Sequence, residues 1–445
     1  MDAASVESFL ELLRFQSIST QPENRGDVEA CARWVLDRFV KMGLKAELWP
    51  TAGHPLVVAR NGHRPDRRTV LIYGHYDVQP ADPLELWDNP PFEPTIRGGV
   101  VTARGATDNK GQFFAHMLGI EATLREKGEL PINLIFLVEG EEEVGSTNLV
   151  PFLEANRQQL ACDVIALSDT GMVGRGHPTF SYGLRGLTAL DIRVVGPSSD
   201  LHSGIYGGAV ANPATVLAHL LASLHGPDNR VLVPGFYDGV RPIEAWEREA
   251  WSGLPIDEDG IRELTGVPQL DGEAGYSALE RIWTRPTVEI NGMGSGYQGP
   301  GSKTVLPAHA FAKLTCRLVP DQDATDIQDK VIAHVRSLCP ASVRVDIERG
   351  HSGAPYVVNP REGFGSAACK ALKRTFGGRE PALVREGGSV PIVADFKRVL
   401  GADSLLLGLA LPDCRIHAPN ENFPLENLEY GMRLNIALLE EIAGA

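Results

Sequence analysis

Residues 69–77 of this chain read TVLIYGHYD, an apolar run of β-forming residues that ends in glycine, histidine and aspartate. Residues 132–143, INLIFLVEGEEE, have the same arrangement, because a second apolar run is followed by acidic residues. Short uninterrupted apolar runs are typical of strands buried on both faces of a parallel sheet. Between them, residues 110–127 have the pattern of a helix that ends near Gly128. A strand, a helix and a second strand in this order predict an α/β domain with a largely parallel sheet.

The α/β pattern covers both ends of the chain and is interrupted in the middle. Apolar residues at helical spacing mark residues 6–13 and 28–39 near the start. From about Leu187 the pattern changes to alternating strands, which indicate a smaller α+β domain. After about Pro360 the α/β pattern resumes and continues to the end of the chain. We therefore expect one α/β domain split by an inserted α+β domain, with the ranges 1–186, 187–360 and 361–445.

The composition limits the classes of partner. The chain has 445 residues, of which 42 are Lys or Arg and 57 are Asp or Glu, so its formal net charge is −15. At ~100–200 residues per domain, the length predicts two to four domains. A content of 43% hydrophobic residues is ordinary for a globular protein and excludes wholesale disorder. A net negative chain binds polyanions poorly, so we expect neither nucleic acid nor a membrane as a partner.

Cysteine usage and the N-terminus bear on the compartment. Six cysteines are scattered without a Cys-x-x-Cys pair, which argues against a disulfide scaffold and against a thiolate zinc site. The first residues are acidic and include no basic segment before an apolar core, so they do not resemble a signal peptide. No apolar run is long enough to span a bilayer. These features predict a cytoplasmic protein.

Side chains that carry chemistry follow the predicted strands at the points where these end. They are, in chain order, His75 and Asp77, Glu142 and Glu143, Asp169, and His417. Asp108 adds a carboxylate just before a predicted helix. In open α/β sheets, ligands bind at the carboxyl ends of the strands. We therefore expect these side chains to share one rim of the sheet.

Each of these motifs also has an ordinary structural explanation when it is taken alone. A His-x-Asp sequence is commonly a surface pair, three consecutive glutamates commonly begin a solvated helix, and Asp108 suits a helix N-cap. Taken together, imidazole and carboxylate ligands without a thiolate suit two divalent ions, typically Zn²⁺ or Mn²⁺, with Co²⁺ also accepted. Of the neighbours Glu142 and Glu143, one could then bind metal while the other transfers protons.

Five motifs extend this interpretation. They are GHYDVQP at 74–80, GATDNKG at 105–111, EGEEEVGS at 139–146, Ser168-Asp169, and DLHSG at 200–204. Together and in this order they resemble the M20 family of dinuclear metallopeptidases, and more narrowly its carnosinase-like dipeptidase branch. The similarity extends from about residue 70 to about residue 420. It implies a three-layer catalytic domain with a mostly parallel sheet, an inserted α+β lid and dimerisation domain, and a homodimer.

The resemblance also implies a set of metal ligands. These are Asp108, which would bridge two divalent ions, His75 and Asp169 for one site, and Glu143 and His417 for the other. Asp77 would hydrogen-bond the ring nitrogen of His75 that does not bind metal, which fixes the orientation of the ring. The family often has a cis peptide after the bridging aspartate, here Asp108–Asn109.

Catalytic roles follow from the same resemblance. Glu142 would be the general base, which takes a proton from a water molecule held between the two ions and returns it to the leaving amine. His202 of the DLHSG motif would stabilise the oxyanion, and in this family it reaches the active site from a partner subunit. The substrate contacts implied are His202, Thr304, Arg317, Ser389 and His417. Without the resemblance, His202 suits a turn and Arg317 a surface salt bridge.

The implied reaction is hydrolysis of dipeptides or short peptides with a free N-terminus, because aspartate at the position of Asp169 accompanies dipeptidase and aminopeptidase activity in the family. Two alternatives stay open, namely an N-acyl-amino-acid deacylase of the same family and a catalytically idle relative that binds metal or ligand. A nucleotide-using enzyme is disfavoured, because the glycine-rich run 292–301 lacks the spacing of a phosphate loop. Residues 227–286 carry no motif that we can interpret.

Overall fold

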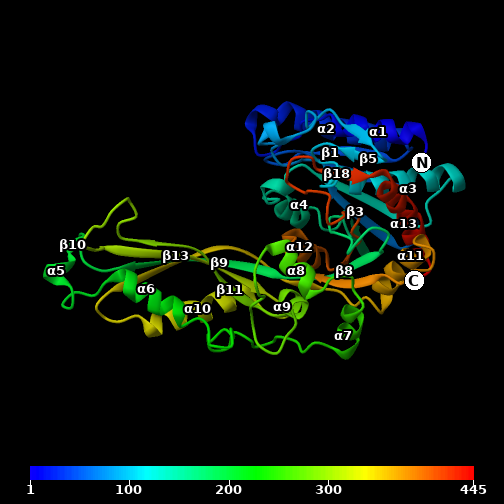
Figure 1. Cartoon of the computed structure of the whole chain (residues 1–445). Helices are drawn as coiled ribbons and strands as arrows, with labels where there is room; N and C mark the ends of the chain where they lie inside the picture. Colours follow the sequence, from blue (N-terminus) through cyan, green and yellow to red (C-terminus); the bar gives the residue numbers. More distant parts are fainter.

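The central feature of the computed structural model, which describes residues 1–445, is a nine-stranded sheet (Figure 1). The strand order is β1-β2-β6-β3-β7-β17-β8-β15, and β16 also pairs with β8. The strands are β1 (Lys45–Trp49), β2 (Leu56–Arg60), β3 (Thr69–His75), β6 (Asn133–Glu139), β7 (Val164–Leu167), β8 (Thr179–Leu184), β15 (Tyr356–Val357), β16 (Ala382–Glu386) and β17 (Asp403–Leu406). β3 pairs in parallel with β6 and β7, and β17 pairs in parallel with β7. The middle of the sheet is therefore parallel, as predicted.

The predicted strand–helix–strand unit is present with nearly the predicted bounds. Its strands are β3 and β6, and its helix is α3 (Lys110–Lys127). The helix ends at Gly128, whose φ is +74°. Glycine adopts this left-handed conformation without the steric cost that a Cβ atom imposes. Every residue of β6 is buried, as expected for a strand that is covered on both faces.

Helices cover both faces of this sheet. Successive strand residues point to opposite faces, and Tyr73 of β3 packs on Phe396 of α12 (Pro391–Leu400), with 5.2 Å between the ring centroids. The next residue, Gly74, lies against Phe113 of α3, where an added Cβ atom would come within 2.5 Å of the Phe113 Cβ. The domain therefore has three layers. The same core includes residues of α1 (Ala3–Leu13), α2 (Arg25–Lys41), α4 (Leu149–Ala155), α11 (Gly363–Thr375) and α13 (Leu425–Ala443).

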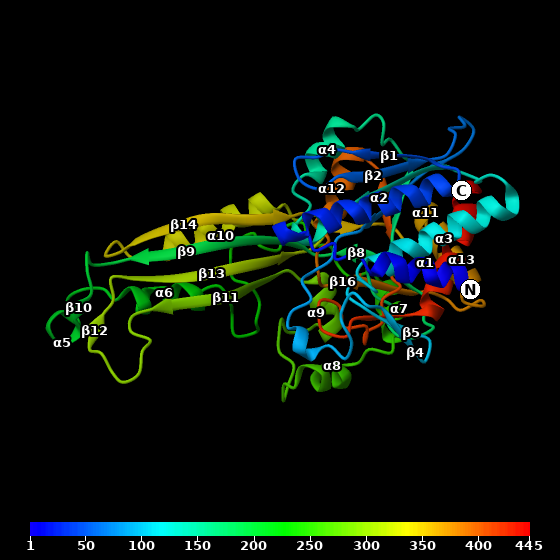
Figure 2. The same ribbon diagram turned by 90° about the horizontal axis from the view of Figure 1, so that it is seen from above.

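A second, four-stranded sheet extends away from the first (Figures 1 and 2). Its strands are antiparallel, in the order β11 (Thr287–Ser295), β13 (His309–Leu318), β9 (Gly186–Val195) and β14 (Arg344–Gly353). Buried residues alternate along β9, because α6 (Pro213–Ala222) and α10 (Ala324–Leu338) pack on one face of this sheet. Leu190, Val216 and Val331 belong to the separate core formed there. This unit matches the alternating strands seen in the sequence.

The long segment without motifs forms three helices, α7 (Ala245–Ser252), α8 (Glu258–Thr265) and α9 (Ala278–Thr284). The rings of Trp251 on α7 and Trp283 on α9 contact each other edge to face at 5.3 Å between centroids. Both tryptophans belong to the core of the nine-stranded sheet rather than to that of the smaller sheet. Part of the segment predicted as an insertion, 187–360, thus packs on the larger core, and the domain boundaries themselves stay a prediction.

Short strands complete the fold. At the outer end of the smaller sheet, β10 (Leu201–His202) pairs with β12 (Val305–Leu306), next to α5 (Ser203–Tyr206) (Figures 1 and 2). On the large domain, β18 (Asn422–Pro424), β5 (Val100–Thr102) and β4 (Thr95–Arg97) form a three-stranded sheet. No helix combines the length and the apolar character that crossing a membrane requires.

Candidate active site

The five residues expected as metal ligands meet at one rim of the nine-stranded sheet. His75 is the last residue of β3, Glu143 lies in the turn after β6, and Asp169 follows β7 by two residues. Asp108 precedes α3, and His417 lies between β17 and β18. Because β6, β3, β7 and β17 are parallel neighbours, their carboxyl ends deliver these side chains to the same place.

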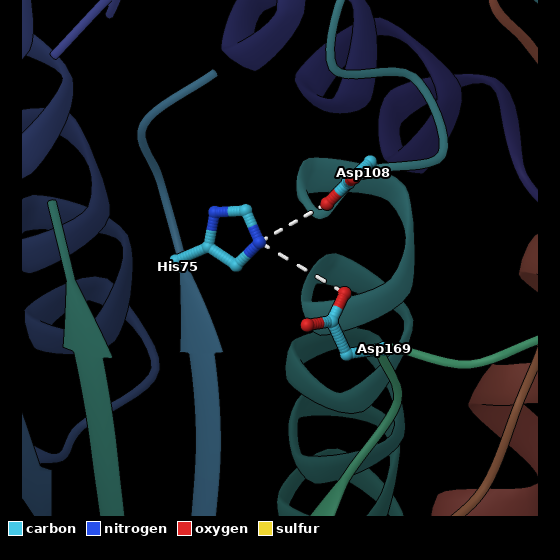
Figure 3. Close-up of side chains that lie close together, drawn as sticks. All are labelled: His75, Asp108 and Asp169. Carbon is cyan, nitrogen blue, oxygen red and sulfur yellow. Dashed lines mark hydrogen bonds and ion pairs between the residues drawn. The ribbon is translucent and has the colours of Figure 1, made fainter. Parts of the chain in front are cut away.

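Asp108 is shared by two clusters of possible metal ligands. In the first, His75 Nε2 lies 3.1 Å from Asp108 Oδ1 and 3.9 Å from Asp169 Oδ1 (Figure 3). In the second, His417 Nε2 lies 2.9 Å from Asp108 Oδ2 and 3.3 Å from Glu143 Oε2. Each carboxylate oxygen of Asp108 thus faces a different imidazole, which is the arrangement needed to bridge two cations. The Asp108–Asn109 peptide is cis, as the resemblance implied.

Asp77 contacts both His75 and the turn after β6 that contains Glu142 and Glu143, here called the glutamate turn. His75 Nδ1 lies 3.1 Å from the Asp77 carbonyl oxygen and 3.4 Å from the Asp77 carboxylate. We expected the carboxylate to hold this nitrogen, and the carbonyl oxygen of the same residue is the nearer acceptor. The Asp77 carboxylate accepts hydrogen bonds from the backbone N–H groups of Glu142 at 3.3 Å and Glu143 at 3.1 Å. Asp77 therefore orients the imidazole of His75 with its carbonyl oxygen and the backbone of Glu142 and Glu143 with its carboxylate.

Three further side chains support the clusters, and the sequence reasoning missed them. Ser19 Oγ donates to Asp77 Oδ2 at 2.6 Å, and Gln79 Nε2 donates to Glu143 Oε2 at 2.8 Å. Asn109 Nδ2 donates to Asp169 Oδ1 at 2.8 Å. Gln79 and Asn109 stand inside the quoted motifs, so their positions next to ligands were a usable signal. Ser19 lies far from any motif and had none.

The charges of the two clusters shift the pKa values of their members. Burial acts to lower the pKa of His75, but hydrogen bonds to Asp108 and Asp169 outweigh it and hold this pKa well above its usual value. Hydrogen bonds to Asp108 and Glu143 raise the pKa of His417 to about 10. The carboxylates thus favour positive charge on both imidazoles. A divalent cation would replace these protons, because metal ligands bind in their deprotonated form.

The donor set fits divalent cations. It combines two imidazoles with three carboxylates and contains no thiolate, which suits ions of intermediate hardness. Glu143 Oε1 is buried and has no hydrogen-bond partner in the protein. Buried polar atoms rarely lack a partner, so this oxygen is poised to bind a group that the protein itself does not provide. The residues present therefore fit two metal ions that share Asp108.

Glu142 stands beside the clusters without belonging to either. Burial raises the pKa of Glu142 to about 9, and the like charges of Asp169 and Asp108 act in the same direction. Its backbone N–H donates to Asp77, whereas its carboxyl group forms no hydrogen bond within the protein. Bound cations would offset the like charges that favour its protonated form, and its free oxygens could then accept a proton and release it again.

The residues expected to contact substrate fall into separate groups. Arg317 Nη1 donates to Ser389 Oγ at 3.3 Å, and Arg317 lines a cavity of about 730 Å³ together with Arg185. His202 and Thr304 lie together at the outer end of the smaller sheet, since the backbone N–H of Ser203 donates to the Thr304 carbonyl oxygen at 3.1 Å. Figure 1 shows that this end, at β10, is remote from β3. Within one chain, the structure does not bring His202 or Thr304 to the metal-ligand clusters.

A buried carboxylate, Glu421, links the loops that carry Asp108 and His417. Its oxygens accept hydrogen bonds from the backbone N–H groups of Gly105, Thr107 and Asp108, each at 2.9 Å. The sequence reasoning missed this residue. No local signal marked it, because the N–H groups that it binds lie more than 300 residues earlier in the chain.

Several known proteins are similar to this chain over most of its length. Residues 71–441 match the model of peptidase family M20/M25/M40. The Cys-Gly metallodipeptidase dug1 of Schizosaccharomyces pombe is 32% identical over 96% of this chain and 93% of its own length. Among solved structures, the M20 family metallo-carboxypeptidase Sso-CP2 from Sulfolobus solfataricus has a TM-score of 0.85, 32% identity and complete coverage of both chains. Human carnosine dipeptidase 1 has a TM-score of 0.78 and 28% identity, and the match covers 99% of this chain and 96% of that one.

The matched range contains all five candidate ligands and Glu142, and it includes the smaller sheet and the large domain from β3 onwards. The family match thus covers the site as well as the fold. This chain belongs to peptidase family M20/M25/M40, and it is a metallopeptidase.

Proposed function

We propose that this protein hydrolyses the peptide bond of dipeptides, or of short peptides with a free N-terminus, with two divalent cations at the rim of the nine-stranded sheet. One observation carries the proposal, namely that Asp108 turns one carboxylate oxygen to His75 and the other to His417. Two relatives that share most of this chain act on dipeptides by name, the yeast Cys-Gly metallodipeptidase and human Beta-Ala-His dipeptidase.

The ligands of the two ions are the residues of the two clusters. One ion would be held by His75, Asp108 and Asp169, and the other by Asp108, Glu143 and His417. Zn²⁺ or Mn²⁺ suits this donor set, and Co²⁺ is accepted by the same ligands. When bound, the ions supply positive charge that polarises the scissile carbonyl group and lowers the pKa of a water molecule between them.

Protein side chains perform the remaining steps. Glu142 accepts the proton of the attacking water and delivers it to the leaving amine, because its carboxyl group is free and adjacent to both clusters. Asp77 keeps the imidazole of His75 in place through its carbonyl oxygen and keeps Glu142 in place through its carboxylate. Arg317 and Ser389 bind the C-terminal carboxylate of the substrate, since a guanidinium group forms paired charge-assisted hydrogen bonds with a carboxylate.

His202 and Thr304 complete the site from a second subunit of a homodimer. His202 is exposed, and its Nδ1 accepts a hydrogen bond from the Gly204 N–H at 3.0 Å, so its other ring nitrogen is free to act as a donor. Both residues belong to the end of the smaller sheet that includes β10, and this end is remote from β3 in the same chain (Figure 1). A partner subunit that docks this end against the rim would supply the hydrogen-bond donor that the tetrahedral oxyanion needs.

A substrate panel tests the proposal. Purified protein is stripped with a chelator, reloaded with Zn²⁺, Mn²⁺ or Co²⁺, and assayed with a free dipeptide, its N-acetylated form and a longer peptide. We expect metal-dependent hydrolysis of the free dipeptide and little hydrolysis of the N-acetylated one. Preference for the N-acetylated substrate would indicate a deacylase, preference for long peptides a carboxypeptidase, and no hydrolysis with full metal loading an idle relative.

A further inference from the structure

The carboxylate of Glu421 is completely buried and uses all of its acceptor capacity. Oε2 accepts hydrogen bonds from Arg104 Nη1 at 2.7 Å and from the Gly105 N–H at 2.9 Å. Oε1 accepts from the N–H groups of Thr107 and Asp108, both at 2.9 Å. A carboxylate has about four lone-pair sites, so none is left for a cation. Glu421 therefore acts on the site only through the residues it holds.

The groups held by Glu421 form the loop that ends in Asp108. The carbonyl oxygen of Glu421 also accepts a hydrogen bond from the Ala103 N–H at 3.0 Å, and Thr107 Oγ1 donates to the carbonyl oxygen of Asn422 at 2.6 Å. The backbone of residues 103–108 is thus tied to residues 421–422 at both ends. Since the Asp108 N–H is one of the tied groups, the position of this ligand depends on Glu421.

The same residue ends the loop that carries His417. This loop includes non-glycine residues with positive φ, namely Arg415 at 58°, His417 at 59° and Asn420 at 62°. Side chains disfavour this conformation, so the loop keeps it only where contacts impose it. Two contacts anchor the end of this loop. Asn420 Oδ1 accepts a hydrogen bond from the Asp88 N–H at 2.9 Å, and Glu421 Oε1 accepts one from the Asp108 N–H at 2.9 Å.

We propose that Glu421 is a positioning residue that sets the separation of Asp108 and His417, and thereby the affinity of the cluster of Asp108, Glu143 and His417 for its cation. The inference rests on the proposed function of this cluster as a metal site. The other cluster shares Asp108, but His75 lies on β3 and Asp169 after β7, and the Glu421 side chain forms no hydrogen bond with either of them. Loss of Glu421 should therefore weaken binding of the ion at Asp108, Glu143 and His417 much more than binding of the ion in the other cluster.

Glu421→Gln tests this role with almost no change in volume. The amide keeps one acceptor oxygen, but its NH₂ group replaces the oxygen that faces other donors and cannot accept from them. The probe is Mn²⁺ alone, titrated into chelator-treated protein, with free Mn²⁺ followed by electron paramagnetic resonance. We expect one ion to bind as in the wild type and the second to bind about 10–100-fold more weakly. Turnover at saturating Mn²⁺ should recover towards the wild-type value.

Glu247→Gln is the matched control. Glu247 is also a buried glutamate, and it accepts hydrogen bonds from Tyr182, from Arg385 and from the Glu244 N–H. It joins α7 to β16, outside both clusters. Its replacement should lower the melting temperature and leave both Mn²⁺ affinities unchanged.

The outcomes separate this inference from the proposed function. If the wild type binds no Mn²⁺, the proposed metal site is wrong and the inference falls with it. If the wild type binds two ions and folded Glu421→Gln binds both with unchanged affinity, only the inference is wrong. Glu421→Asp, which keeps the charge on a shorter side chain, should give an intermediate loss. If neither variant folds, Glu421 determines the fold rather than the separation of the ligands, and the proposal is rejected.

Discussion

The rim of the nine-stranded sheet and the outer end of the smaller sheet differ in how much of a site one chain builds. At the rim, ends of parallel strands converge, and the side chains of His75, Asp77 and Glu143 are almost completely buried. Hydrogen bonds from Ser19 and Gln79 hold the carboxylates in place. At the outer end, His202 and Thr304 are exposed, and the strand β10 there is remote from β3.

Under the proposed function, this difference separates what the folding of one chain provides from what a second chain would supply. A buried cluster that the protein cross-links before any ligand arrives is preorganised, so metal binding needs little rearrangement. An exposed histidine on a short two-residue strand is not preorganised towards the rim of its own chain. Under the proposed function, one chain is sufficient to bind the metal ions, whereas catalysis would require a second chain.

The largest expected effect concerns the rim alone. Glu142→Gln removes the proposed base and keeps the volume of the side chain, and Glu142 is not in either ligand cluster. We expect turnover of a dipeptide to fall about 10²–10⁴-fold, the range typical of general acid–base catalysis. Metal content measured by mass spectrometry should stay at the wild-type value. Retained turnover in the fully loaded variant would contradict the role of Glu142.

The second effect tests the outer end and its partner. His202→Ala should lower turnover about 10²–10³-fold, as for loss of one oxyanion donor, with unchanged metal affinity. Its strongest test is complementation with Glu142→Gln. In a mixed dimer, the chain with Glu142 would receive His202 from its partner, so one of two sites is restored. Random mixing would then recover about a quarter of wild-type turnover. If the two inactive variants form mixed dimers without regaining activity, His202 does not act across subunits.

The rim was predictable from the sequence for a physical reason. Strands buried on both faces are continuous apolar runs, and their ends are marked by the first polar residues, His75 after TVLIYG and Glu139 after INLIFLV. Parallel pairing then requires that these ends meet. The alternating residues of β9 and β13 indicated a sheet with one covered face by the same logic.

Long-range contacts were not predictable in this way. Trp251 and Trp283 lie in a segment rich in proline, glycine and charge, and only the tertiary structure brings them together in the larger core. Glu421 is more than 300 residues from the N–H groups that it binds, and no local pattern reports such a contact. The order of motifs likewise says nothing about the separation of His202 from His75, since it records sequence and not position.

A smaller effect tests the substrate contacts between the two regions. Arg317→Ala should raise KM for a dipeptide about 10–100-fold, because a charge-assisted hydrogen bond to a carboxylate contributes about 1.5–3 kcal/mol. Lys313→Ala is the control, since Lys313 lies on the same face of β13 and pairs with Asp191 at an exposed position. An unchanged KM in the Arg317 variant would show that Arg317 does not bind the substrate, and its role would then be that of a surface residue.

The smallest expected effect tests whether residues beyond the direct neighbours of the metal ligands contribute to metal affinity. Ser19→Ala removes the 2.6 Å hydrogen bond to Asp77 Oδ2, so Asp77 holds His75 and the glutamate turn less firmly. We expect Mn²⁺ affinity to fall about tenfold, the lower end of the range for partners of metal ligands. Ser17→Ala is a matched control, because Ser17 Oγ donates to the Tyr76 carbonyl oxygen at 2.6 Å and forms no hydrogen bond with the Asp77 side chain. It should lower the melting temperature without changing Mn²⁺ affinity. Equal affinities in both variants would mean that the orientation of Asp77 is set by the glutamate turn alone, and that the N-terminal segment supports the fold but not the metal site.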